Sequence, residues 1–220
     1  MSSPYMIQPT DQLGRFCSLW LRQQPNLPDN SEAVYKQLVD AYNEPHRVYH
    51  SLRHIQSCLT VFDEISDLLD NPDAVELAIW FHDIIYKIDD KQSEQLSANF
   101  FMRLTDGLFT NECRDSVYQH IMATRHDCSE ITNKDTKLMV DIDLSSFGLP
   151  WADFITDSKN VRAEMGHLSD AQYNQKQMSF HQSLLNQPTF FNSDYFHEHY
   201  EDQARSNLAK LFELIKSNTL

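Results

Sequence analysis

The sequence predicts an all-α fold, and three observations support this prediction. Apolar residues recur at the spacing of a helix face in nearly every segment of the 220-residue chain. The chain contains only four glycines, although tight hairpin turns and phosphate-binding loops depend on glycine. No internal repeat, low-complexity tract or long linker divides the sequence. We therefore expect a single all-α domain that spans residues 1–220.

Three helices are predicted before residue 71, at about residues 11–24, 29–44 and 49–70. The first carries apolar residues on one face and ends where Pro25 opens a proline-containing segment. Asp29 and Glu32 have the spacing of a capping box and mark the start of the second helix, which ends before Pro45. The third helix is long and has a continuous apolar side.

A central helix is predicted from Asn71 and Pro72 onward. Asn can cap the free amide groups of a helix start, and Pro fits the first helical position. From Leu77 to Tyr86 the sequence is apolar on every side except for His82 and Asp83. A helix that is apolar all round is expected at the centre of the molecule.

The rest of the chain predicts further helices, each supported by apolar residues at helical spacing. The helix that ends near residue 147 is followed by Gly148 and Pro150, which are typical of a helix end. The predicted helices cover about residues 93–105, 112–125, 134–147, 151–165, 169–186 and 194–217.

The charge and composition exclude several classes of protein. The chain has 18 Lys and Arg against 32 Asp and Glu, a net charge of −14, which would repel duplex nucleic acid. No apolar run is long enough to span a bilayer, and the amino terminus lacks a charged region followed by an apolar stretch. The four cysteines are far apart, which argues against a disulfide framework or a thiolate zinc site. We expect a cytoplasmic protein that binds neither duplex nucleic acid nor a membrane.

Polar groups inside apolar helices point to a metal site. An ionised carboxylate such as that of Asp83 requires a cation, several hydrogen bonds or a bound metal when it is buried. His50 and His54 are four residues apart, so on a helix they share a face beside apolar positions. At least one of these histidines can therefore point inward beside His82.

A third polar feature lies in the apolar segment near residue 140. Asp141 and Asp143 are two residues apart, so on a regular helix they point about 200° away from each other. We expect one of them to be a metal ligand and the other to be a capping or supporting group. Histidine nitrogens and carboxylate oxygens together suit a divalent ion, with Mn, Mg, Co, Ni, Zn and Fe as candidates.

Several strings of this sequence resemble the HD superfamily of metal-dependent phosphohydrolases, and more closely a bacterial subgroup of predicted HD phosphohydrolases. The family pattern is a His, an adjacent His-Asp pair and a distant Asp, all on helices. The resemblance covers about residues 42–214 and rests on RVYHSLRHI, AIWFHDIIY, SEQLSA, ATRHD, VDIDLSSFG, VRAEM and YEDQARSNL. The metal ligands that it implies are His54, His82, Asp83 and Asp143, with His50 and Asp141 as rivals.

The resemblance implies an HD-type helical bundle with a metal-binding core at about residues 42–150 and additional C-terminal helices at about 151–217. It also implies an enzyme that hydrolyses a small phosphorylated metabolite, with a nucleotide as the favoured substrate and metal-activated water as the nucleophile. One departure from the family pattern is that Asn174, Gln175 and Lys176 stand where Gly-Arg is expected after a tyrosine. A homodimer is compatible with the sequence.

Four residues are predicted to act in catalysis: Asp83, Glu94, His126 and Arg162. Phosphate oxygens need positive charge or hydrogen-bond donors, and we rank His126 first and Arg162 second among the candidates, ahead of Arg53 and Arg125. Glu94 stands at a predicted helix start, where it can face the metal or substrate or serve only the helix start.

Two other functions remain open from the sequence. HD-type diiron oxygenases use two extra histidines before the final Asp, and here His120 and His126 are the only histidines in that interval. Their six-residue separation brings both to one site only if a helix ends between them. The second alternative is a non-catalytic HD domain that binds a nucleotide or a protein partner.

Overall fold

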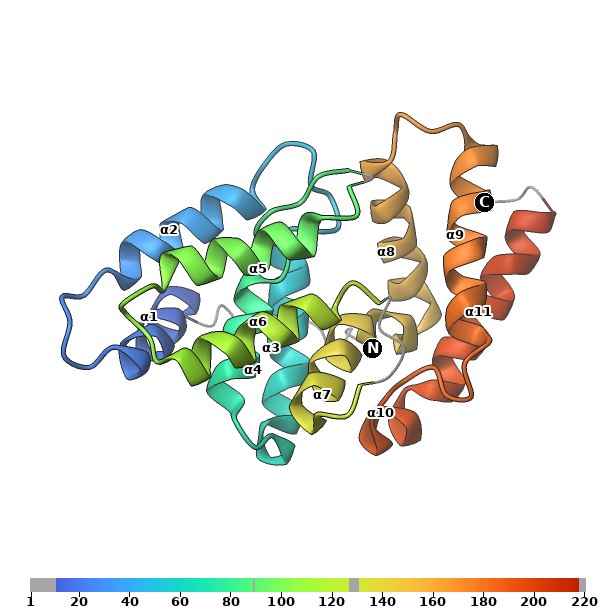
Figure 1. Ribbon diagram of the computed structural model, residues 1–220. Helices are drawn as coiled ribbons and strands as arrows, with labels where there is room; N and C mark the ends of the chain where they lie inside the picture. The colour runs from blue at the N-terminus through green and yellow to red at the C-terminus, as the bar shows by residue number, and fades with distance from the viewer. Residues whose placement is uncertain (1–10, 89, 127–130, 218–220) are drawn as a thin grey trace.

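The computed structural model describes residues 11–88, 90–126 and 131–217, and it confirms the all-α fold class. Throughout these ranges the chain forms helices joined by turns, and no strand occurs in them (Figure 1). None of the helices in the described part of the chain has the length and apolarity that a membrane span requires.

The helices follow one another along the chain with short connections. The α-helices are α1 (Gln12–Gln23), α2 (Ser31–Tyr42), α3 (Leu52–Ile65), α4 (Pro72–Phe81), α5 (Ser93–Leu104), α6 (Asn111–Ala123), α7 (Lys134–Asp143), α8 (Trp151–Glu164), α9 (Asp170–Leu185), α10 (Asp194–His199) and α11 (Glu201–Lys216). Two short 3-10 helices continue α3 and α7, namely η1 (Ser66–Leu68) and η2 (Leu144–Gly148).

Helix α4 lies at the centre, as its sequence predicts. All its residues from Ala74 to Phe81 are buried, and the helix packs against α3, α5, α6 and α7. Its one buried acid, Glu76, receives a hydrogen bond of 2.7 Å from Nε of Arg15. The Asn71 side chain caps the helix by accepting from the amide of Ala74 at 3.2 Å. The sequence signals for this helix therefore act as expected.

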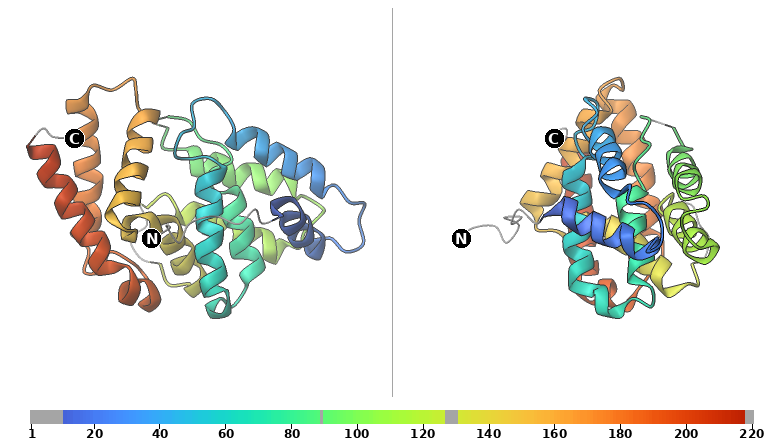
Figure 2. Two further views of the ribbon diagram at one scale, coloured as in Figure 1. Left: turned by 180° about the vertical axis from the view of Figure 1, so that it is seen from behind. Right: turned by 90° about the vertical axis from the view of Figure 1, so that its left-hand side faces the viewer.

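The two ends of the molecule are formed by different parts of the chain. Helices α1 and α2 lie at one end, and α9, α10 and α11 lie at the other, beside α8 (Figures 1 and 2). The buried apolar side chains nevertheless form one cluster, which extends from α1 to α11. The division into a metal-binding core and C-terminal helices stays a prediction.

Several predicted helix ends are wrong because contacts distant in sequence set them. The third helix begins at Leu52 rather than near residue 49, since the preceding backbone amides donate to the Glu164 carboxylate. Helix α4 ends at Phe81, so His82 and Asp83 follow the helix instead of lying inside it.

The second and the last of the predicted helices are also corrected. Asn30 rather than Asp29 is the N-cap of α2, and Asp29 instead accepts from the amide and hydroxyl of Ser31. The single helix expected at 194–217 is divided between α10 and α11 next to Glu201, whose carboxylate accepts from two backbone amides outside the helix.

Candidate metal centre

Three packed helices bring four predicted ligands together. His54 lies in the first turn of α3, His82 and Asp83 directly follow α4, and Asp143 is the last residue of α7. Helices α3, α4 and α7 all contact one another. The ligands therefore lie at helix ends, where side chains from different helices can converge on one point.

The ligand atoms of these side chains are close to one another. Nε2 of His54 lies 3.2 Å from Nε2 of His82 and 3.1 Å from Oδ1 of Asp143. Nε2 of His82 lies 3.5 Å from the same oxygen. Oδ2 of Asp83 lies 3.2 Å from Nε2 of His82 and 3.8 Å from Nε2 of His54.

These separations fit ligands of a shared divalent ion. Ligand atoms at about 2.0–2.2 Å from a metal lie roughly 2.8–3.6 Å apart when the angle between them is about 90–110°. The ligand atoms of His54, His82 and Asp143 all meet within 4.8 Å, and these three residues could hold a metal ion. Asp83 adjoins both histidines of this group. We call these four residues the metal centre.

Hydrogen bonds orient the His82 ring toward the metal centre. Its Nδ1 lies 2.9 Å from the carbonyl oxygen of Ile79, which can only accept, so Nδ1 carries the proton. Nε2 is then the nitrogen that faces the other ligands, and its lone pair becomes available to a cation when the ring is neutral. On the other histidine, Nδ1 of His54 lies 3.8 Å from the Cys58 sulfur, which is itself buried.

The electrostatics of the metal centre favour a cation. Burial raises the pKa of the Asp143 carboxyl, but hydrogen bonds from His126, His54 and His82 hold it well below its usual range. Burial lowers the pKa of His82, whereas the Asp83 and Asp143 carboxylates raise it well above normal. Both carboxylates are therefore ionised at neutral pH, although Asp83 is buried and Asp143 is only partly exposed.

His126 reaches the metal centre through the second oxygen of Asp143. Its Nε2 donates to Oδ2 of that carboxylate at 3.0 Å. The backbone of His126 has φ of 54°, a left-handed conformation that is uncommon outside glycine, three residues after the end of α6. The helix end between His120 and His126 turns only His126 toward Asp143.

The two rival ligands have other partners. His50 precedes α3, so it does not share a helix face with His54; its Nδ1 donates to Glu164 at 2.6 Å. Asp141 is fully buried, and its carboxylate accepts hydrogen bonds of 2.6–2.9 Å from the backbone and side chains of Asn192 and Ser193. The expectation that Asp141 and Asp143 have different roles therefore agrees with their separate partners.

His120 lies away from the metal centre. Its Nδ1 is 2.9 Å from the hydroxyl of Thr136 in the first turn of α7, whereas Asp143 ends that helix two turns later. Because a helix rises about 1.5 Å per residue, the seven-residue offset separates the two sites by roughly 10 Å. The second histidine pair that a diiron centre needs is therefore not assembled by His120 and His126.

Two buried histidines predict sensitivity to acid. Burial lowers the pKa of His120 and of His181 to about 4, below the ordinary 6.5. Between about pH 4 and pH 6.5 these histidines bind more protons in the unfolded chain than in the folded chain. The free energy of unfolding therefore falls as pH is lowered through this range, by up to about 1.4 kcal/mol per pH unit for each histidine. Urea unfolding at pH 6.5 and 5 should give a smaller loss for His120→Leu than for the wild type. His46→Gln, at an exposed position, is the control variant. An equal loss of stability in His120→Leu and in the wild type would contradict this expectation.

The other predicted catalytic residues have distinct surroundings. Glu94 is half-buried at the start of α5; burial raises its pKa, Asp83 adds to the rise, and His126 opposes it, so this carboxyl is within electrostatic reach of the metal centre. The Arg162 guanidinium instead donates to the carbonyl oxygens of Met165 and Leu168 and to Asp170. A phosphate contact from Arg162 would compete with these three bonds.

Glu164 is a buried residue whose importance the sequence did not reveal. It ends α8, is 4% exposed, and accepts hydrogen bonds of 2.6–3.0 Å from five donors. Burial raises the pKa of this carboxyl, but His50 and the backbone amides lower it to about 2. We name this arrangement the Glu164 clamp; its donors are the amides of Val48, Tyr49 and His50, Nδ1 of His50 and the hydroxyl of Tyr86.

Arg47 is a second residue that sequence reasoning missed. Its guanidinium is buried and donates to the carbonyl oxygens of Asp83 and Ile84 at 2.6 and 2.9 Å. It also donates to the carbonyl of His50 at 3.2 Å. Arg47 therefore joins the segment that follows α4 to the segment that precedes α3, and both segments carry residues of the site.

Comparisons of this chain with protein-family models, with curated proteins and with solved structures give no match. The arrangement of the side chains is therefore the basis on which a function is proposed.

Proposed function

We propose that this protein is a metal-dependent phosphohydrolase of the HD type that acts on a small phosphorylated metabolite. The observation that supports the proposal is the convergence of two imidazole nitrogens and a carboxylate oxygen at separations suited to one divalent ion. His54, His82 and Asp143 would hold the ion, and Asp83 would complete the set. When bound, such an ion supplies a Lewis acid that activates water and polarises a phosphoryl oxygen.

The residues around the metal centre have complementary roles in this proposal. His126 donates to Asp143 and thereby fixes the orientation of that carboxylate. Glu94 is a carboxyl near the metal centre whose raised pKa suits it to exchange a proton with substrate or water. His50 lines the adjoining cavity; burial lowers the pKa of its ring, but Asp83 and Glu164 raise it above normal. In the protonated ring Nδ1 donates to Glu164, and Nε2 can donate to a phosphate or leaving-group oxygen.

Metal analysis followed by a phosphatase screen tests this function. We expect about one divalent ion per wild-type chain and phosphate release from at least one member of a nucleotide and sugar phosphate panel with Mn, Co, Mg or Ni. Asp83→Asn should lose the bound ion and the phosphate release. Asp67→Asn, at an exposed site on η1, should keep the bound ion and the phosphate release.

Other outcomes would identify a different function. A bound ion without turnover of any phosphate ester would favour a binding domain. Iron with oxygen consumption would favour the oxygenase. A chain that binds no divalent ion under any condition would contradict the proposal at its first step.

A further inference from the structure

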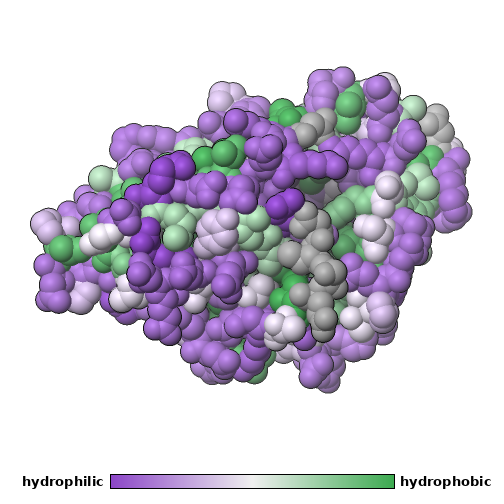
Figure 3. All heavy atoms as spheres, in the orientation of Figure 1, coloured by the Kyte–Doolittle hydropathy of each residue, from purple (hydrophilic) through white to green (hydrophobic). Residues whose placement is uncertain are grey.

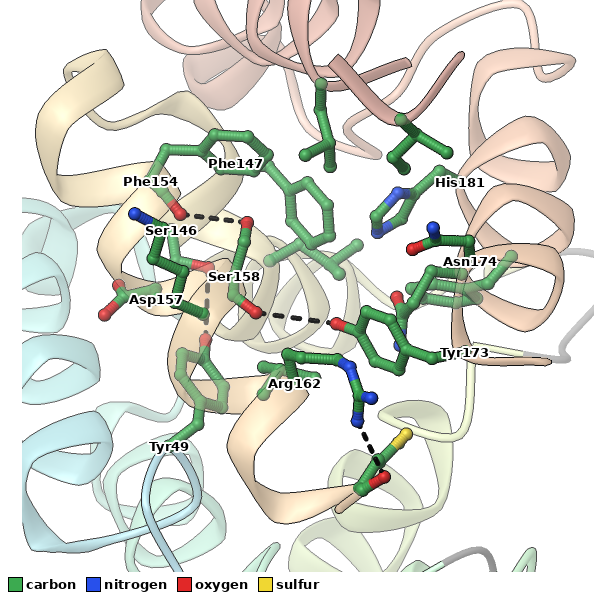
Figure 4. A pocket seen from close by; sticks show the side chains of 18 of the residues that line it. Tyr49, Ser146, Phe147, Phe154, Asp157, Ser158, Arg162, Tyr173, Asn174 and His181 are labelled. Atoms are coloured by element: carbon green, nitrogen blue, oxygen red, sulfur yellow. Dashed lines mark hydrogen bonds between the residues drawn. The ribbon is translucent and has the colours of Figure 1, made fainter. Parts of the chain in front are cut away.

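A cavity of about 420 Å³ adjoins the metal centre on the side of the C-terminal helices (Figure 4). Asp143 and His126 lie at one part of its wall, and Tyr49 and His50 contribute to the same wall. The remaining wall is built by η2, α8, α9 and α11. A volume of this size accommodates the organic part of a small molecule whose phosphate lies at the metal centre.

The wall of this cavity is mainly aromatic and aliphatic. The rings of Phe147, Phe154 and Tyr173 lie around it (Figure 4). Leu211 and Ile215 of α11 add aliphatic side chains to the wall. Most of the face seen in Figure 3 is hydrophilic, but hydrophobic atoms are visible between α8 and α9. Such a wall favours a flat, uncharged group over a sugar, whose hydroxyls would lose hydrogen bonds to water.

A buried polar atom in the cavity wall lacks a partner. His181 is 6% exposed, and no residue in the described part of the chain forms a hydrogen bond with its Nδ1. Because burial lowers the pKa of His181 to about 4, the ring is neutral at physiological pH. An unsatisfied polar group of this kind costs stability; because Nδ1 is itself closed to solvent, a ligand supplies the missing hydrogen bond only when the imidazole turns toward the cavity. Asn174 and Gln177, one turn apart on α9, add amide groups to the same cavity.

The charges around the cavity suit one phosphate and not several. The wall has two basic side chains other than histidine, and one of them, Arg162, is hydrogen-bonded to Asp170. Three carboxylates stand against two basic side chains other than histidine in the wall, so the second and third phosphates of a triphosphate would meet a net negative charge. The acidic side chains of the wall are Asp143, Asp157 and Asp170, and the basic ones are Lys159 and Arg162.

From these observations we infer that the cavity selects a phosphomonoester with a single phosphate and an uncharged, ring-shaped organic group that carries a hydrogen-bonding atom. The metal-centre side of the cavity takes the phosphate, and the aromatic wall takes the ring. The His181 imidazole, turned toward the cavity, then forms a hydrogen bond with the polar atom of the ligand's ring. The part of this inference that concerns the phosphate rests on the proposed function, whereas the part that concerns binding of the ring does not.

Binding of indole to the metal-depleted protein tests the ring site separately from hydrolysis. We expect indole to bind to the wild type after chelation, as measured by ligand-observed NMR or calorimetry. Ile215→Trp should fill part of the cavity and weaken this binding at least about 10-fold. Leu68→Trp, at an exposed position on η1, adds the same ring elsewhere and should bind indole as the wild type does. Circular dichroism establishes that both variants are folded.

The role of His181 is tested with indole and its hydrocarbon counterpart indene. The wild type should prefer indole, and His181→Phe should remove that preference. The variant should also melt about 2–4 °C higher without ligand, because it removes a buried polar group that lacks a partner. An unchanged preference for indole would overturn the assignment of His181.

Hydrolysis then tests the complete inference. With the metal that supports turnover, indoxyl phosphate should be hydrolysed at least about 10-fold more efficiently than glucose 6-phosphate or a nucleoside triphosphate, and more efficiently than 1-naphthyl phosphate, whose ring lacks a hydrogen-bonding atom. Failure of hydrolysis with retained indole binding would reject the proposed function alone. Absence of indole binding, equal binding by Ile215→Trp, or equal turnover of a triphosphate would overturn the inference.

Discussion

Asp143→Asn should remove the divalent ion from the protein while leaving the fold intact. The substitution keeps the size of the side chain but replaces a charged oxygen that lies 3.1 Å from His54 Nε2 and 3.5 Å from His82 Nε2. Because even residues that only support metal ligands change affinity by about 10–100-fold, we expect a loss greater than about 100-fold here. Metal titration with a competing chelator measures this loss, and phosphate release should fall in parallel.

Asp141→Asn is the matched control, since it makes the same chemical change two residues earlier. Asp141 binds the backbone and side chains of Asn192 and Ser193, so its replacement should destabilise the protein and leave the affinity for metal unchanged. The pair therefore separates a loss of ligand from a loss of stability. If Asp141→Asn abolished metal binding and Asp143→Asn did not, the assignment of the metal centre would be incorrect.

Glu164→Ala should cause the largest loss of stability among single substitutions near the site. The change leaves three backbone amides and two side-chain donors of the Glu164 clamp without their acceptor. Removal of a buried, charged partner of this kind costs about 3–5 kcal/mol in the free energy of unfolding. Chemical unfolding monitored by circular dichroism measures the difference.

Glu213→Ala provides the comparison for that experiment. Glu213 is an exposed acid on α11 that pairs with Lys216, and surface pairs of this kind contribute less than about 1 kcal/mol. A loss below about 1 kcal/mol for Glu164→Ala would show that the Glu164 clamp does not stabilise the fold in the way described.

Local sequence signals were sufficient for the all-α fold class and for the central position of α4. The uniformly apolar segment from Leu77 and the Asn71-Pro72 start needed no knowledge of distant contacts, and both predictions agree with the structure. The same holds for the opposite directions of Asp141 and Asp143, which follow from the helix period alone. Local periodicity therefore predicts well that a segment is helical and in which directions its side chains point.

Long-range contacts set the features that the sequence did not reveal. Helix α3 starts late because amides near residue 49 bind Glu164, which lies more than 110 residues further along the chain. The separation of His50 from His54 follows from that late start. Helix periodicity alone likewise does not decide between Asp143 and Asp141, because Asp141 is occupied by Asn192, a residue distant in sequence; the resemblance of the strings favoured Asp143.

The Glu164 clamp makes the amino-terminal and carboxy-terminal parts of the chain interdependent. A shortened chain that stopped at residue 150 would retain every residue of the metal centre, yet it would lose the acceptor that orders the segment just before α3. It would also lose the hydrogen-bond donors that bind the buried carboxylate of Asp141. The four residues of the metal centre thus owe their alignment to a portion of the polypeptide that contributes none of them. A fragment that contained only residues 1–150 would therefore not keep this alignment.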